Sequence, residues 1–84
     1  MKPPASQKYP VSQEMYDRLQ NTFCYHAPKP DQLPRYEELR AEARDMATLM
    51  VMLCPPSREL SLALTHLEEA VMQANAAIAR NEAG

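Results

Sequence analysis

The chain has 84 residues, of which 45% are hydrophobic and 24% are charged, and its formal net charge is −2. A domain this small buries too little apolar surface to be comfortably stable alone, and its charge argues against DNA or RNA polymers as partners. No stretch approaches the roughly 18 apolar residues that a membrane span needs. The single glycine is terminal Gly84, which excludes glycine-rich phosphate loops and disfavours β-hairpins, so we expect an all-α chain. Its small size makes self-association the expected source of stability.

Residues 1–11 hold three of the eight prolines and are expected to form an arm. Ser12 is a suitable N-cap for a short helix in "SQEMYDRLQN", whose apolar residues would share one side. The following stretch, "TFCYHAPKP", should be extended, because Pro28 and Pro30 disfavour helical geometry in the residues before them. We therefore divide the chain into an arm with a short helix, residues 1–22, and a second unit, residues 23–84.

Two long helices are predicted within the second unit. Asp31 is placed as the cap of the first, roughly residues 32–53, with Pro34 in its first turn, where the missing N–H costs nothing. The "CPP" that follows ends this helix, and Ser57 caps the next one, which should continue to about Asn81. Because about three residues join the helices, they should pack as an antiparallel hairpin.

Apolar residues recur at helical spacing in both long helices. The stripes are Tyr36, Leu39, Ala43, Met46, Ala47, Met50 and Leu53 in the first, and Leu60, Leu64, Leu67, Val71, Ala74 and Ile78 in the second. The segment "MATLMVML" is apolar on nearly all sides, which a two-helix hairpin cannot cover by itself. A symmetric partner, and so a homo-oligomer, is the simplest cover for the remaining surface.

The aromatic residues between the helices have two interpretations. If the linker is extended, Phe23 and Tyr25 alternate along it and point the same way. They either fasten the linker onto the hairpin or stack on a flat ligand, and we assign the first role to Phe23 and the second to Tyr25, since tyrosine can stack and hydrogen-bond at once.

Three arginines are candidates for binding phosphate. Arg58 follows Ser57 in a first helical turn, where the helix dipole favours anions. A bound phosphate, or a salt bridge to a glutamate of a neighbouring chain, explains Arg58 equally well. Arg40 and Arg44 share one helix face, where they either pair with Glu37, Glu38 and Glu42 or direct their guanidinium groups at phosphates.

The remaining polar candidates do not form a catalytic set. Asn75 lies beside an apolar stripe, where its amide either fixes helix register or reads a nucleobase edge or ribose hydroxyl. His66 is expected at the surface or an interface. Neither a Ser–His–Asp arrangement nor an HExxH motif is present, so binding without turnover is the simpler reading.

The cysteines do not point to a disulfide framework or a metal centre. Cys24 and Cys54 are only two, and "MKPPASQKYP" lacks the apolar region of a secretory leader, so we expect a reducing cytoplasmic setting. Together with His26 and His66 they match no standard zinc spacing. No metal and no cofactor is expected.

The runs "NTFCYHAPKPDQLPRYEELR" and "CPPSRELSLALTHLEEAVMQANAAIARNE" resemble the phage cyclic-nucleotide sponges that counter the CBASS and Thoeris defences of bacteria. The resemblance implies a small helical protomer in a homo-oligomer, commonly a hexamer, without enzyme activity. Such proteins bind cyclic dinucleotides, cyclic trinucleotides or cyclic ADP-ribose variants in the cytoplasm of the infected host and withhold them from effectors.

The resemblance also implies roles for individual residues. Tyr25 and Arg40 match positions that clamp a cyclic dinucleotide between protomers, and Arg58 matches one that binds a cyclic trinucleotide near a threefold axis. Asn75 matches a pocket position of the branch that binds cyclic ADP-ribose. Weaker matches are Lys29 and Arg44, and Gln73 stands where a tryptophan is expected. On this reading "FCYH", which contains Phe23, Tyr25 and His26, is a lip over a pocket shared by two protomers.

Two other functions remain as alternatives. The chain would also suit a helical phage interaction or structural module that oligomerises and binds no small ligand. A cyclic-nucleotide hydrolase is the weakest alternative, because no catalytic group set is visible.

Overall fold

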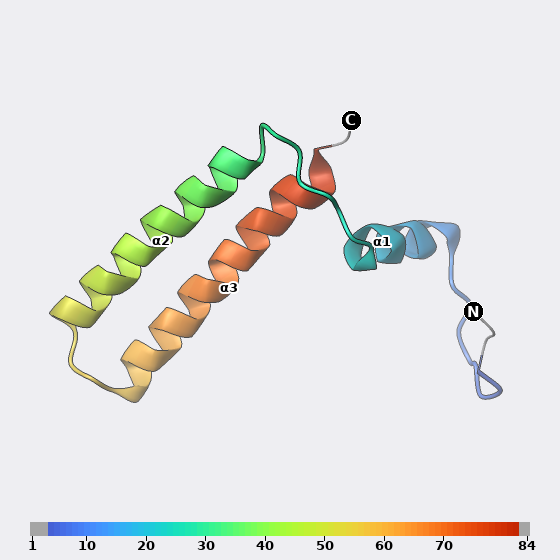
Figure 1. The fold of residues 1–84 in the computed structure, drawn as a ribbon. Coiled ribbons are helices and arrows are strands. Elements are labelled where there is room, and N and C mark those ends of the chain that lie inside the picture. The colour runs from blue at the N-terminus through green and yellow to red at the C-terminus, as the bar shows by residue number, and fades with distance from the viewer. Residues whose placement is uncertain (1–3, 83–84) are drawn as a thin grey trace.

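The computed structural model describes residues 4–82, which form three helices and no strand (Figure 1). Helix α1 spans Gln13–Phe23, α2 spans Leu33–Leu53 and α3 spans Arg58–Asn81. Helices α2 and α3 lie side by side as an antiparallel hairpin, and α1 lies beyond the end at which α2 begins and α3 finishes. The predicted all-α fold, a short helix followed by a long helical hairpin, is confirmed.

Local capping signals set most of the helix ends. The Ser12 hydroxyl accepts a hydrogen bond of 3.1 Å from the backbone N–H of Met15, and the Ser57 hydroxyl accepts one of 3.1 Å from that of Leu60. Both contacts satisfy N–H groups that a first helical turn leaves without a partner. Pro34 lies in the first turn of α2 and Cys54 follows its last turn, as predicted.

The prediction that Asp31 caps α2 is wrong. Gln32 occupies the cap position with helical backbone angles and makes no side-chain cap bond. The Asp31 carboxylate instead accepts a hydrogen bond of 3.3 Å from Arg35, one turn further along α2. Arg35 therefore binds the carboxylate that the sequence pattern had assigned to the backbone N–H groups at the start of α2.

The expected geometry of the aromatic pair is also wrong. Helix α1 continues to Phe23, and the backbone N–H of Cys24 still donates to the carbonyl of Gln20 at 3.1 Å. Phe23 is therefore helical rather than part of an extended run with Tyr25. Its side chain is 80% exposed, so it does not fasten the linker onto the hairpin. The stop signal in this segment, Pro28, stands too far along to end α1 earlier.

Apolar surface is only partly covered in the single chain. Within residues 4–82 no hydrophobic side chain is fully buried, although most of the two stripes are half-buried between α2 and α3. The exposed residues at the end of α2 include Val51, Met52 and Leu53, the last of them 74% exposed. The Cα radius of gyration is 18.3 Å, against about 12 Å for a compact chain of this length.

A group of polar residues joins the end of the hairpin opposite its turn. We call Lys29, Gln32, Arg35 and Glu82 the open-end clamp. Arg35 donates to both carboxylate oxygens of Glu82, at 2.6 and 2.7 Å, and Gln32 Nε2 donates to Glu82 Oε1 at 3.1 Å. Lys29 Nζ donates to the backbone carbonyl of Glu82 at 2.8 Å. Gln32 is only 2% exposed, which makes it the one fully buried polar residue of the described chain.

Candidate functional site

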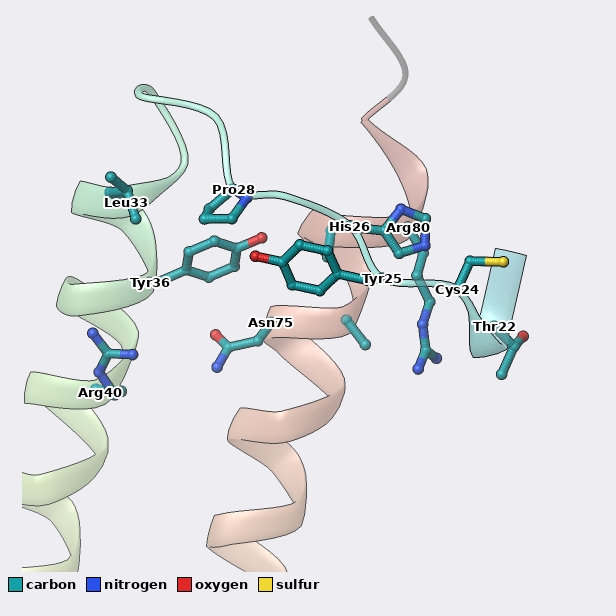
Figure 2. A pocket seen from close by; sticks show the side chains of 12 residues that line it. Thr22, Cys24, Tyr25, His26, Pro28, Leu33, Tyr36, Arg40, Asn75 and Arg80 are labelled. Atoms are coloured by element: carbon teal, nitrogen blue, oxygen red, sulfur yellow. The ribbon is translucent and has the colours of Figure 1, made fainter. Parts of the chain in front are cut away.

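A hollow of about 480 Å³ lies where the linker between α1 and α2 crosses the hairpin (Figure 2). We call it the linker hollow. Four residues singled out in the sequence line it together: Tyr25 and His26 from the linker, Arg40 from α2 and Asn75 from α3. Its volume lies within the range of about 300–1,000 Å³ typical of small-molecule sites. Residues 50 positions apart thus meet around one space.

A second concavity of about 490 Å³ adjoins the first, and we call it the hairpin groove. Arg40 and Asn75 line both spaces, and Arg44 lines the groove alone. The floor is apolar, with residues such as Leu64 and Val71, while Glu68 adds one carboxylate. The two concavities therefore share a border that carries one guanidinium and one amide.

Asn75 carries an unsatisfied polar atom at this border. Its Oδ1 is buried and has no hydrogen-bond partner. Leaving a buried acceptor without a donor costs about 1–3 kcal/mol. An N–H or O–H group of a bound molecule would offset that cost, so the amide is suited to reading a polar edge.

The linker is held in place at its start by two hydrogen bonds. A ring nitrogen of His26, Nε2, donates to the backbone carbonyl of Asn21 at 2.8 Å, because that oxygen can only accept. Asn21 Nδ2 in turn donates to the carbonyl of Arg80 in the last turn of α3, at 3.3 Å. In neutral histidine this leaves Nδ1 as an acceptor for a ligand.

The arginines of the two concavities are not neutralised by the carboxylates that the sequence offers. Arg40 and Arg44 are exposed, and neither makes an ion pair within residues 4–82. Ion pairing with Glu37, Glu38 or Glu42, the alternative to phosphate binding, is therefore absent from that part of the chain. Both guanidinium groups retain their donors for an anionic ligand.

Comparison with known protein families assigns the chain to a group. The family model described as the Acb2/Tad1 hairpin domain matches residues 15–79, which is most of the chain. The chain belongs to this family. The Acb2/Tad1 proteins are the sponges that counter CBASS and Thoeris, so the resemblance read from the sequence is confirmed. The family is one of ligand-binding domains rather than enzymes.

Two further comparisons contribute nothing to the assignment. A search among curated proteins finds no match to this chain, and neither does a search among solved structures.

Arg58 and Phe23, two of the predicted ligand-binding residues, lie outside both concavities. Arg58 opens α3 at the opposite end of the hairpin, 17 residues before Asn75, or about 25 Å away at 1.5 Å per residue. Phe23 lines neither space. Within one chain, no small ligand can therefore contact Arg58 and the linker hollow at the same time.

The sequence analysis did not place a tyrosine and an arginine that line the linker hollow, Tyr36 and Arg80. Tyr36 was assigned to the apolar stripe of α2. Figure 2 shows its ring extending from α2 toward the ring of Tyr25, which extends from the linker. Arg80 also lines the hollow from the last turn of α3. From the sequence alone, a tyrosine in an apolar stripe can equally pack in a core or line a pocket. Only its hydroxyl group indicated the second.

The other polar candidates have simple surroundings. Cys24 and Cys54 are free and exposed. His66 is also exposed, as predicted, and lies 3.6 Å from Glu69 on the same helix. Among residues 4–82, no three or more histidine, cysteine or acidic residues cluster as metal ligands would. In the same range, no helix is both long and apolar enough to cross a bilayer.

Proposed function

We propose that this protein is a phage immune-evasion protein that binds cyclic nucleotide second messengers of CBASS or Thoeris and sequesters them without degrading them. It would act in the cytoplasm of the infected bacterium. The observation that carries the proposal is the meeting of Tyr25, Arg40 and Asn75 at the linker hollow in a chain of the Acb2/Tad1 family.

The three side chains offer the chemistry that a cyclic nucleotide requires. Tyr25 is 86% exposed, so its ring is free to stack on a base, which is worth about 1–3 kcal/mol. Arg40 can donate two parallel hydrogen bonds to a phosphate. Asn75 Oδ1 accepts from a base amine or a ribose hydroxyl, which satisfies the atom that lacks a partner. Arg44, in the adjoining groove, supports a second phosphate.

A second copy of the chain would complete the site. The linker hollow is open to solvent and Tyr25, which lines it, is 86% exposed, while exposed apolar residues cover the end of α2. Burying the end of α2 in a homo-oligomer would stabilise the small protomer, and a further contact between copies at the opposite, open end of the hairpin would bring another wall to the hollow. A hexamer is the assembly that the family resemblance favours. Arg58 would then serve a separate site for a cyclic trinucleotide, and Phe23 an interface between copies.

Isothermal titration with 3′,3′-cGAMP, cyclic triadenylate and glycocyclic ADP-ribose tests the proposal. We expect tight binding of at least one nucleotide and recovery of that ligand, chemically unchanged, after heat denaturation. Arg40→Ala should weaken the binding of a cyclic dinucleotide, while Arg18→Ala, on α1 and outside both concavities, should not. Degraded ligand would mean an enzyme, and flat titrations with all three nucleotides would contradict sequestration.

A ligand-free interaction module is the alternative that one observation favours. The extent of exposed apolar surface suits a helical protein that only assembles with copies of itself or with phage proteins. This alternative predicts a stable oligomer, flat titrations, and no effect of Arg40→Ala beyond stability.

A further inference from the structure

We propose that the last turn of α3, with Glu82 at its end, is the anchor that positions Tyr25 and His26 over the linker hollow. Glu82 would then be a positioning residue for ligand binding, although it does not line that hollow. The inference rests on the proposed function, because the positioned residues are those that would hold the nucleotide.

Both ends of the linker are tied to the same short segment, residues 80–82. In the last turn of α1, just before the linker, Asn21 donates to the carbonyl of Arg80, and its own carbonyl accepts from the ring of His26. At the end of the linker, Lys29 donates to the carbonyl of Glu82. Tyr25 lies between these ties, with a side chain that the described chain leaves largely exposed. Its position therefore depends on the segments that flank it.

Gln32 connects the linker to the carboxylate of Glu82. Its Oε1 accepts from the backbone N–H of Lys29 at 2.9 Å, while its Nε2 donates to Glu82 Oε1 at 3.1 Å. The side chain is buried, so losing either partner would leave a polar group unsatisfied. Gln32 thus couples the position of the Glu82 carboxylate to that of the linker backbone at Lys29.

Arg35 fixes the carboxylate itself. Its guanidinium makes a two-point contact with Glu82 and also bonds Asp31, so it spans the end of α3 and the start of α2. A two-point contact restricts orientation as well as distance. The contact with Arg35, followed by that with Gln32, lowers the pKa of Glu82 to about 2, so the carboxylate is charged at neutral pH.

Releasing the clamp would reduce the fraction of molecules in which the linker is ready to bind. The apparent dissociation constant rises in inverse proportion to that fraction. If one molecule in ten keeps the linker ordered, the apparent dissociation constant rises about tenfold. The long helices should remain paired, because their apolar stripes do not involve Glu82.

The test compares Glu82→Ala with Glu69→Ala, which removes an exposed carboxylate from the same helix. Titration with 3′,3′-cGAMP, cyclic triadenylate and glycocyclic ADP-ribose, and amide hydrogen exchange without ligand, are measured for both variants. We expect Glu82→Ala to raise the dissociation constant about tenfold and to speed exchange in residues 24–32, with α2 and α3 still protected. Glu69→Ala should match the wild type in both measurements.

The conservative variant Glu82→Gln provides the rescue, since its side-chain oxygen can still accept from both Gln32 and Arg35, which donate to Glu82 Oε1 in the wild type. It should recover most of the affinity and slow the exchange of the linker, which a general loss of stability would not allow. Wild-type affinity in Glu82→Ala, or faster exchange spread evenly over α2 and α3, would overturn the positioning role. If the wild type binds none of the three nucleotides, the proposed function fails, while the exchange data still decide whether Glu82 holds the linker.

Discussion

The two ends of the hairpin are held in different ways. At the closed end, a short turn joins α2 to α3, whose N-cap is Ser57. The last residues of α2 expose apolar side chains there. At the open end, the clamp joins Arg35 to Glu82 across 47 residues of sequence, and the linker carries Tyr25 over a hollow. The closed end therefore exposes apolar surface, and the open end gathers polar groups around a hollow. Under the proposed function, the first would meet a partner chain and the second a ligand.

Leu53→Lys should have the largest effect, because it tests whether the closed end is buried in an assembly. Burying an unpaired ammonium group costs several kcal/mol, so we expect the oligomer to dissociate. Helicity should persist, since a cation suits the C-terminal end of a helix. Light scattering after size exclusion measures the mass. The control is Val11→Lys, which also places a lysine at an exposed apolar residue, here in the arm. An unchanged mass for Leu53→Lys would contradict burial of the closed end in an assembly.

Tyr25→Ala should have the next largest effect, and it tests the open end. Losing one stacking contact of about 1–3 kcal/mol raises the dissociation constant for a cyclic dinucleotide roughly 5- to 150-fold. Tyr25→Phe should retain most of the affinity. Titration calorimetry measures both variants against Tyr9→Ala, which removes another exposed tyrosine. Equal losses of affinity in Tyr9→Ala and Tyr25→Ala would mean that Tyr25 has no specific role in binding the nucleotide.

Ser57→Ala compares the caps of the hairpin and of α1. Loss of an N-cap costs about 1 kcal/mol, which lowers the midpoint of thermal unfolding by roughly 4–8 °C for a domain of this size. Ser12→Ala should lower it less, because α1 lies beyond the hairpin. Circular dichroism during heating gives both midpoints. A larger drop for Ser12→Ala would mean that α1 is part of the cooperative unit.

Acid should weaken the open-end clamp by a smaller amount. The folded-state pKa of Glu82 is lowered from 4.5 to about 2, so its stabilisation is present above pH 4.5 and is lost as the pH falls toward 2. Both partners are partly exposed to solvent, which limits the effect. Urea unfolding of wild type and Glu82→Gln should therefore give stabilities that converge in this range. A constant difference between them would exclude a titrating clamp.

Much of the fold follows from local sequence. Ser12, Ser57 and the two prolines after Cys54 act within one helical turn, so they mark helix ends without knowledge of the fold. The assignment failed at Asp31 because Arg35 competes for its carboxylate. The role of Gln32 depends on Glu82, 50 residues away, and no local pattern reveals such a partner.

The candidate site could be predicted only in part, because some of its residues are recognisable by themselves and others only by their neighbours in space. Tyr25 stood out as an aromatic ring in a proline-bounded linker, and Arg40 because the family resemblance matches it to a position that clamps a cyclic dinucleotide. Asn75 stood out as an amide beside an apolar stripe. Tyr36 and the clamp were missed, since their roles appear only when the first turns of α2 meet the last turns of α3.

Native mass spectrometry of the protein mixed with 3′,3′-cGAMP, cyclic triadenylate and glycocyclic ADP-ribose tests the central claim most directly. It reports the number of subunits and the mass of any bound ligand in one spectrum. We expect an oligomer that carries at least one of these nucleotides at its intact mass. A ligand-free monomer across the whole panel would contradict the claim that copies of this hairpin assemble around a cyclic nucleotide.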